Sequence, residues 1–239
     1  MDSAQPYRTA DRATPTNDTG RAARVRLFAL LAEGERIAFH IASREALLAT
    51  EPSLQQFFRR QAAQEARHAA IFDRVVAYFG REIDVAAIRA SAAFNVESSA
   101  IAQMLARAVA SGNLPLMVIG LQGVIEGVGV AILESMRPAL HADGALFEPI
   151  RRLVLAKERA HQHIGERALA VAMSDGRITY SAAASALSDS LACAHSLLLA
   201  NEEIFERVGR STGAMCADVT LHAEAFLLAT RRIQTGRSN

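Results

Sequence analysis

The sequence predicts an all-α protein built as a bundle of antiparallel helices. Strand signals are nearly absent, because β-branched runs with period-two alternation do not occur. Long blocks rich in Ala and Leu keep a helical periodicity, and short breakers such as Glu51-Pro52 and Ser111-Gly112 separate them. Connections this short place successive helices antiparallel, which is the arrangement of a helical bundle.

The helices that we expect follow one another within a single domain. In chain order they span residues 21–49, 53–79, a short stretch from Asp84, 96–110, 114–134, a stretch from the Asp143-Gly144 turn to 172, 181–209 and 213–233. Residues 1–20 are polar and broken by prolines, so we expect a disordered N-terminal tail rather than a signal peptide, and a cytoplasmic protein. The domain then covers residues 21–234, with a flexible C-terminus at 235–239.

Composition narrows the possible functions. The apolar fraction is 51% and the net charge is +1, which argues against a nucleic-acid-binding protein. Cys193 and Cys216 form no C-x-x-C pair, so a zinc ribbon, a rubredoxin-type site or a disulfide framework is not expected. Residues 114–133 are long enough to cross a membrane, but Gln122 and Glu126 lie at their centre. No second span or basic flank accompanies them, so we expect a central helix surrounded by protein and no membrane span.

Two E-x-x-H motifs carry the strongest chemical signal. They are Glu65-x-x-His68 and Glu158-x-x-His161. Residues three apart lie on the same face of a helix, so each motif presents a carboxylate and an imidazole in one direction.

Single glutamates on the preceding helices complete a recognisable set. Glu35 lies 30 residues before Glu65, and Glu126 lies 32 residues before Glu158. A carboxylate-bridged di-metal site in a four-helix bundle needs one Glu from each of two helices and Glu-x-x-His from the other two. The spacing therefore predicts two matching helical hairpins that face one another across a metal site.

The sequence allows two interpretations for Glu126 and two candidates for the ligand on the first helix. Glu126 is the only charged residue between Leu114 and Ile132, and burying an unpaired carboxylate is costly. It is either a metal ligand, which we favour, or a protonated acid bonded to Gln122 one turn earlier. For the first helix we favour Glu35 over Glu33, because Glu35 continues an apolar stripe and Glu33 falls at its edge.

The predicted ligands are hard and borderline donors, suited to iron or manganese. We expect two iron ions, or a manganese–iron pair; zinc would also bind but is redox-inert. The ligands are Glu35, Glu65, His68, Glu126, Glu158 and His161. The remaining histidines are expected outside the site, namely His40, His141, His163, His195 and His222.

The motifs also resemble those of a known family. They are Glu33-Gly34-Glu35 with Ala38, Glu65-x-x-His68, Ile125-Glu126, and Glu158-x-x-His161 followed by Gly165-Glu166. Between about residues 25 and 172 the chain resembles the aldehyde-deformylating oxygenases, or fatty aldehyde decarbonylases. The resemblance implies a ferritin-like four-helix bundle with additional connecting and C-terminal helices, iron at the six positions, a hydrophobic substrate channel, and an external electron donor such as a ferredoxin and its reductase.

The chain also departs from that family. The departures are Arg36, Phe39 and His40 after the first ligand, Val75 and Val76 after the first motif, and Lys157 before the second. The substrate therefore stays open within the class.

The leading functional hypothesis is a di-iron oxygenase that activates dioxygen and attacks an apolar small molecule. Its most specific form is aldehyde deformylation, which yields a shortened hydrocarbon and formate. The alternatives are a di-iron hydroxylase or N-oxygenase of a biosynthetic pathway, a ferritin- or rubrerythrin-like protein that stores iron or detoxifies peroxide, and a helical scaffold with a coincidental pattern.

Glycines around Glu126 suggest where a substrate would lie. Each glycine in a helix interior costs about 1 kcal/mol relative to Ala, so Gly123 and Gly127 need a reason. Either they allow close helix packing, or with Gln122 they line a substrate channel beside Glu126. The helices after Ser181 carry no motif and are expected to complete the bundle and cover the site.

Overall fold

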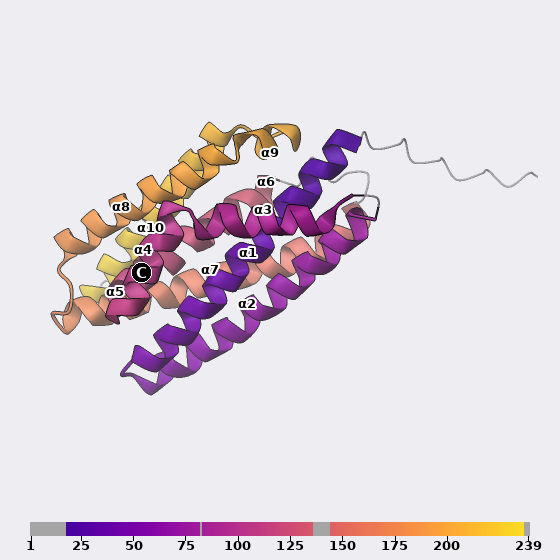
Figure 1. Cartoon of the computed structure of the whole chain (residues 1–239). Coiled ribbons are helices and arrows are strands. Elements are labelled where there is room, and N and C mark those ends of the chain that lie inside the picture. Colours follow the sequence, from indigo (N-terminus) through magenta and orange to yellow (C-terminus); the bar gives the residue numbers. More distant parts are fainter. Residues whose placement is uncertain (1–17, 82, 136–143, 237–239) are drawn as a thin grey trace, which may run out of the picture.

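The computed structural model describes residues 18–81, 83–135 and 144–236, and every regular element within these ranges is helical (Figure 1). The all-α prediction is thereby confirmed. The greater part of the expected N-terminal tail and the turn with His141 and Asp143 lie outside the described residues.

The first hairpin joins α1 (Asp18–Leu48) to α2 (Pro52–Phe79). The two helices run antiparallel and side by side along most of their length (Figure 1). Pro52 occupies the first turn of α2, where a missing N–H costs nothing, and the Gly80 N–H bonds the Val76 carbonyl at the other end. This hairpin carries one Glu and one E-x-x-H motif in a fixed register.

Two short helices cross to the other half of the bundle. They are α3 (Val85–Glu97) and α4 (Ala100–Ser111). The side chains of Asp84 and Ser99 accept hydrogen bonds from the N–H groups of Ala87 and Ala102 and so cap the two helices. The expected helix over 96–110 therefore begins later, because the Ser99 cap separates α4 from the end of α3.

The apolar segment forms the buried central rod. It consists of α5 (Leu114–Gly120), a π-helical turn η1 (Leu121–Ile125) and α6 (Glu126–Ser135). The sequence predicts one regular helix here, whereas the structure has a π turn in the middle. In a π turn the hydrogen bonds span one residue more than in an α-helix, so the residues before and after it change their relative phase.

The remaining helices enclose this rod. They are α7 (Gly144–Ser174), α8 (Tyr180–Ala200), α9 (Glu202–Arg207) and α10 (Thr212–Gln234). The single helix expected over 181–209 is broken at Asn201, whose side-chain amide donates to the Leu197 carbonyl at 2.9 Å. The four long antiparallel segments of the bundle are thus α1, α2, α5–α6 and α7 (Figure 1). Of the later helices, α8 packs on α4 and α5, α9 on α1, and α10 on α6 and α7.

Two of the described helical segments are long and apolar enough to cross a membrane, whereas the sequence analysis expected only one. In Leu114–Ser135 the most hydropathic window is 78% buried, as expected for the centre of a bundle. The second, α8, has a window that is only 28% buried, because it lies on the outside. The cytoplasmic location stays a prediction.

Aromatic side chains fill the end of the first hairpin. Phe28 and Phe72 are fully buried, with ring centroids 5.9 Å apart. A buried Phe contributes about 1.5–3 kcal/mol relative to an exposed one. This apolar contact fixes α1 against α2 close to the predicted ligands.

The glycines around Glu126 serve helix packing. A Cβ on Gly127 would lie 2.6 Å from Cδ2 of His222, and one on Gly123 would lie 3.1 Å from the Phe226 ring. Both partners belong to α10, which therefore approaches the central rod closely. Gly129, by contrast, has no heavy atom within 4 Å of such a Cβ.

This contrast gives a matched pair of substitutions in one helix. Gly127→Ala must displace His222, while Gly129→Ala only gains helix propensity. We expect the free energy of unfolding of Gly127→Ala to lie about 1–3 kcal/mol below that of Gly129→Ala. Urea denaturation followed by circular dichroism measures the difference, and equal stability would show that α10 does not pack on Gly127 in this way.

Candidate metal centre

The predicted ligands come from four different helical segments. Glu35 lies on α1, Glu65 and His68 on α2, Glu126 at the first residue of α6, and Glu158 and His161 on α7. The structure brings these side chains together in the interior of the bundle, in two overlapping groups of potential ligands.

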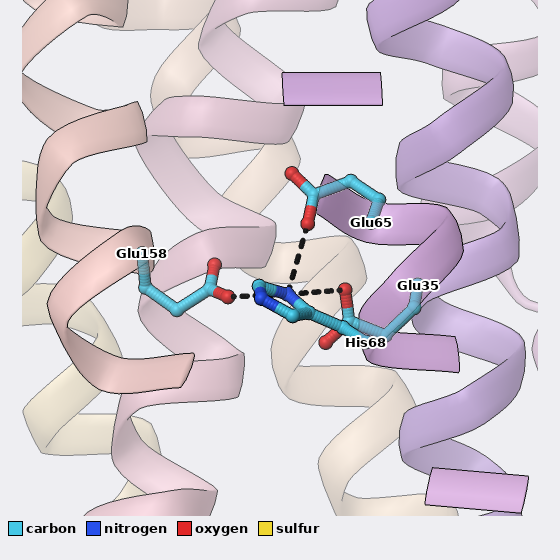
Figure 2. Close-up of side chains that lie close together, drawn as sticks. All are labelled: Glu35, Glu65, His68 and Glu158. Carbon is cyan, nitrogen blue, oxygen red and sulfur yellow. Dashed lines mark ion pairs between the residues drawn. The ribbon is translucent and has the colours of Figure 1, made fainter. Parts of the chain in front are cut away.

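The first group contains Glu35, Glu65, His68 and Glu158 (Figure 2). Nδ1 of His68 lies 3.2 Å from Glu65 Oε2, 3.3 Å from Glu158 Oε1 and 3.5 Å from Glu35 Oε2. Figure 2 shows the three carboxylates converging on this imidazole from different sides.

The second group contains Glu65, Glu126 and His161. Nδ1 of His161 lies 3.0 Å from Glu65 Oε1 and 3.4 Å from Glu126 Oε1. The second oxygen of Glu158 lies 3.8 Å from the same nitrogen. Glu65 and Glu158 therefore each turn one oxygen toward His68 and the other toward His161, which is the disposition of two carboxylates that bridge a pair of ions.

The hydrogen bonding of these atoms fits a metal pair. Both oxygens of Glu65, Oε1 of Glu158 and Nδ1 of each histidine are buried, and none forms a hydrogen bond of good geometry within the described part of the chain. Buried polar groups are normally bonded, because leaving them unsatisfied costs about 1–3 kcal/mol each. Cations placed between these atoms would satisfy them together, and carboxylate with imidazole suits iron or manganese.

Charge pairing perturbs the titration of this cluster. Burial by itself lowers the pKa of His68, but the carboxylates of Glu158, Glu35 and Glu65 outweigh it and raise the pKa to about 11. His161 behaves alike, with burial opposed by Glu158 and Glu65 and a pKa of about 9. In the metal-free protein, protons on both imidazoles supply part of the positive charge that the carboxylates need.

The pKa values of the two carboxylic acids Glu35 and Glu65 shift in opposite directions. Burial raises the pKa of Glu35 well above its usual range, and the nearby His68 imidazole offsets this only in part. Burial also acts on Glu65, but the two imidazoles outweigh it and lower its pKa to about 2. Glu65, which faces both histidines, is thus more strongly ionised than Glu35.

The structure bears on the alternatives that the sequence left open for Glu33 and Glu126. Glu33 pairs with Arg36 away from the cluster, whereas Glu35 lies within it. Glu126 does not bond to Gln122, because the π turn intervenes; its Oε1 accepts a hydrogen bond from Gln61 Nε2 at 2.7 Å.

Two buried residues beside the cluster escaped the sequence analysis. Gln61 and Glu45 are both fully buried, and Gln122 Nε2 donates to Glu45 Oε2 at 2.9 Å. Burial raises the pKa of Glu45 to about 8, and the bond from Gln122 lowers it only in part. A signal was present, since Glu45 continues the apolar stripe of Ala38 and Ala42, and Gln61 precedes Glu65 by one helical turn.

The other histidines lie outside the two groups, as far as the structure describes them. His163 pairs with Glu166 at 3.2 Å, as expected. His195 bonds the Cys216 carbonyl at 3.1 Å, and His222 packs against Gly127. His40 is exposed, and His141 lies outside the described residues.

An apolar cavity of about 90 Å³ adjoins the cluster. Glu35, Glu126 and Glu158 form part of its wall, and apart from Ser99 and Asn201 its other lining residues are apolar or glycine. Leu197, Leu198 and Phe205 of α8 and α9 close it, so the late helices do cover the site. The expected channel residues Gln122, Gly123 and Gly127 are not among its lining; the first bonds Glu45 and the glycines pack against α10.

Comparisons with known proteins relate the chain to others by fold. No protein-family model matches the sequence, and no curated protein matches it. A solved structure from Synechococcus, described as protein 19 with aldehyde deformylating oxidase activity, superposes with a TM-score of 0.76 at 17% identity. The match covers 93% of this chain and 98% of that one. The likeness confirms the predicted all-α, ferritin-like fold, and at this identity it concerns the fold alone.

The raised pKa values of the histidines make metal binding depend on pH. Both imidazoles hold a proton at pH 7 and must lose it to bind a metal through Nδ1. We expect loading with ferrous iron to release about one proton per histidine. The apparent affinity should rise with pH up to about 9 at the position of His161 and up to about 11 at that of His68. Calorimetry at pH 7 in buffers of different ionisation enthalpy measures the protons released. A binding heat that is the same in every buffer would contradict this ligand assignment.

Proposed function

We propose that this protein is a non-haem di-iron oxygenase that activates dioxygen and acts on an apolar small molecule. The observation that carries the proposal is the cavity whose wall combines Glu35, Glu126 and Glu158 with an otherwise almost wholly apolar surface. A substrate in this cavity would lie directly against the ligand cluster. A protein that stores iron or detoxifies peroxide needs no such space, so the cavity favours an oxygenase over these roles.

The residues of the cluster would hold two iron ions. Glu35, Glu65, His68 and Glu158 would hold one ion, and Glu65, Glu126, Glu158 and His161 would hold the other. The bound pair would supply the redox chemistry needed for the reaction of dioxygen.

The apolar side chains of the cavity wall would bind the substrate rather than the metal ions. Ile125, Val128 and Ile132 present an apolar wall on the side of the central rod, and Leu197 and Phe205 close the cavity from the late helices. Such a wall binds a hydrocarbon portion through burial of apolar surface and keeps bulk water from the reacting end. The cavity lies below the roughly 150 Å³ that accommodates benzene in an engineered protein cavity, which favours short chains.

The most specific form of the proposal is aldehyde deformylation. The bond between the carbonyl carbon and its neighbour would break, and the products would be formate and a hydrocarbon shortened by one carbon. Dioxygen would provide oxygen, and an external donor such as a ferredoxin with its reductase would provide electrons. The motifs shared with the aldehyde-deformylating oxygenases and the fold shared with the Synechococcus protein support this choice.

The test uses the iron-loaded protein with a reducing system, dioxygen and a panel of short, medium and long aldehydes. We expect formate and the shortened hydrocarbon in equal amounts. Absence of formate from every aldehyde would remove deformylation. Oxygen uptake stimulated by apolar amines or alkanes in the same assay would then favour the N-oxygenase or hydroxylase alternative.

A cavity variant links turnover to this site. Gly129 borders the cavity and has open space around it, so Gly129→Leu should fill the cavity without disturbing the ligands. We expect unchanged iron content and turnover reduced about tenfold or more, because the substrate is displaced. Gly20→Leu, on α1 and away from the cavity, is the control. Full turnover of every substrate by Gly129→Leu would show that the cavity is not the substrate site.

A further inference from the structure

The two candidate metal positions differ in what surrounds them. At the position of Glu126 and His161, two side-chain amides from α2 form hydrogen bonds with the ligands, and Gln61 bonds the Glu126 oxygen that faces His161. Gln61 Nε2 donates to Glu126 Oε1 at 2.7 Å, and His161 Nε2 and Gln64 Oε1 are also 2.7 Å apart. A glutamine Oε1 can only accept, so His161 Nε2 carries the hydrogen and Nδ1 is left to face the site.

The bond to Glu126 belongs to a longer buried chain. Gln61 Oε1 accepts from Gln122 Nε2 at 3.1 Å, and the same nitrogen donates to Glu45 Oε2 at 2.9 Å. The amide of Gln61 is thus held at both ends, by Glu126 and by Gln122. Rotating it would leave buried groups without partners, which costs about 1–3 kcal/mol for each. The chain ties α1, α2 and the π turn together and holds Glu126 in one orientation.

Glu45 forms the far end of this chain. It is fully buried, belongs to neither group of potential ligands, and has no cationic partner among the described residues. A neutral carboxylic acid fits such a place, in agreement with its pKa of about 8. Glu45 then acts as a neutral hydrogen-bonding partner of Gln122, and a glutamine side chain can fill the same role.

The position of Glu35 and His68 has no comparable support. Within the described residues, both side chains have polar contacts only to other members of the first group. Both Glu35 and Glu126 border the cavity, so access does not distinguish the two positions. The two positions differ in the hydrogen bonds that neighbouring residues form with the ligands. Such bonds orient metal-binding residues and commonly change metal affinity 10–100-fold.

We propose that the metal positions are inequivalent, and that Gln61, Gln122, Glu45 and Gln64 preorganise the position of Glu126 and His161 so that it binds the first ion more tightly. This rests on the proposed two-metal centre. The position of Glu35 and His68 fills second and loses its ion first. Gln61 and Gln64 are positioning residues, since they act through Glu126 and His161.

The test is an anaerobic titration of the metal-free, full-length protein with Co²⁺, whose visible spectrum reports its ligand geometry. For the wild type we expect two binding phases whose affinities differ about 10–100-fold. Glu35→Ala should keep the tighter phase and lose the weaker one. Glu126→Ala should lose the tighter phase.

Substitution of the supporting residues separates positioning from mere folding. Gln61→Leu should weaken the tighter phase about 10–100-fold and shift the spectrum of the first cobalt ion. Gln64 is only half-buried, so Gln64→Leu provides a second variant with the same expected direction should Gln61→Leu fail to fold. Glu45→Gln should keep both the affinity and the spectrum. Gln103→Leu, on the exposed face of α4, is the matched control.

The outcomes are distinct. Equal affinity of the two phases in the wild type would overturn the proposal, as would an unchanged tighter phase and spectrum in both Gln61→Leu and Gln64→Leu. Failure of the wild type to bind cobalt or iron would instead overturn the metal centre itself. Two ions in the wild type with the expected losses in the variants would establish the inequivalence.

Discussion

Burial of negative charge is the constraint on which the rest of this structure depends. Glu65, Glu126 and Glu158 are at most 4% exposed, within a bundle whose core is made mainly of apolar side chains. Isolated carboxylates in such a place would cost several kcal/mol each or would take up protons. The imidazoles of the two E-x-x-H motifs neutralise only part of this negative charge. The raised pKa values of Glu35, His68 and His161 are a sign of the charge that stays uncompensated. A pair of divalent cations would compensate it more fully, which is the physical reason for assigning this cluster to metals.

The architecture can be understood as the means of holding these charges together. The short hairpin turn and the packing of Phe28 on Phe72 fix α1 against α2, and so place Glu35 beside Glu65 and His68. The π turn ends directly before Glu126 and turns Gln122 toward Gln61 and Glu45 instead. Close approach of α10 at Gly127 supports the central rod from the other side. The cavity lies between this rod, α1, the crossing helices α3 and α4, and the late helices.

The helical fold and the helix faces that carry the clustered Glu and His side chains could be predicted from the sequence, because both depend on residue spacing within single helices. Helical period fixes which residues share a face, so Glu65 with His68 and Glu158 with His161 follow directly from their spacing. Glu126 was found because it is a lone charge in an apolar segment, and Glu35 because it continues an apolar stripe. Each of these signals is local to one helix.

The missed features depend on contacts between helices. A π turn changes the helical phase by one residue without any compositional mark, so the sequence could not show that Gln122 bonds Gln61 and Glu45 instead of Glu126, the partner considered as an alternative. The spacing of Glu45 and Gln61 places them on buried faces, but their bonds to Gln122 and Glu126 appear only when α1 and α2 are placed against the rod. The break at Asn201 and the partner of Gly127 likewise depend on packing that no single segment contains.

The most direct test of the central claim is a crystal structure of the protein loaded anaerobically with ferrous iron, with anomalous scattering measured at the iron edge. The account predicts two peaks about 4 Å apart, one beside Nδ1 of His68 and one beside Nδ1 of His161, with Glu65 and Glu158 between them. A single peak, or peaks that do not touch Glu126 and Glu158, would contradict it.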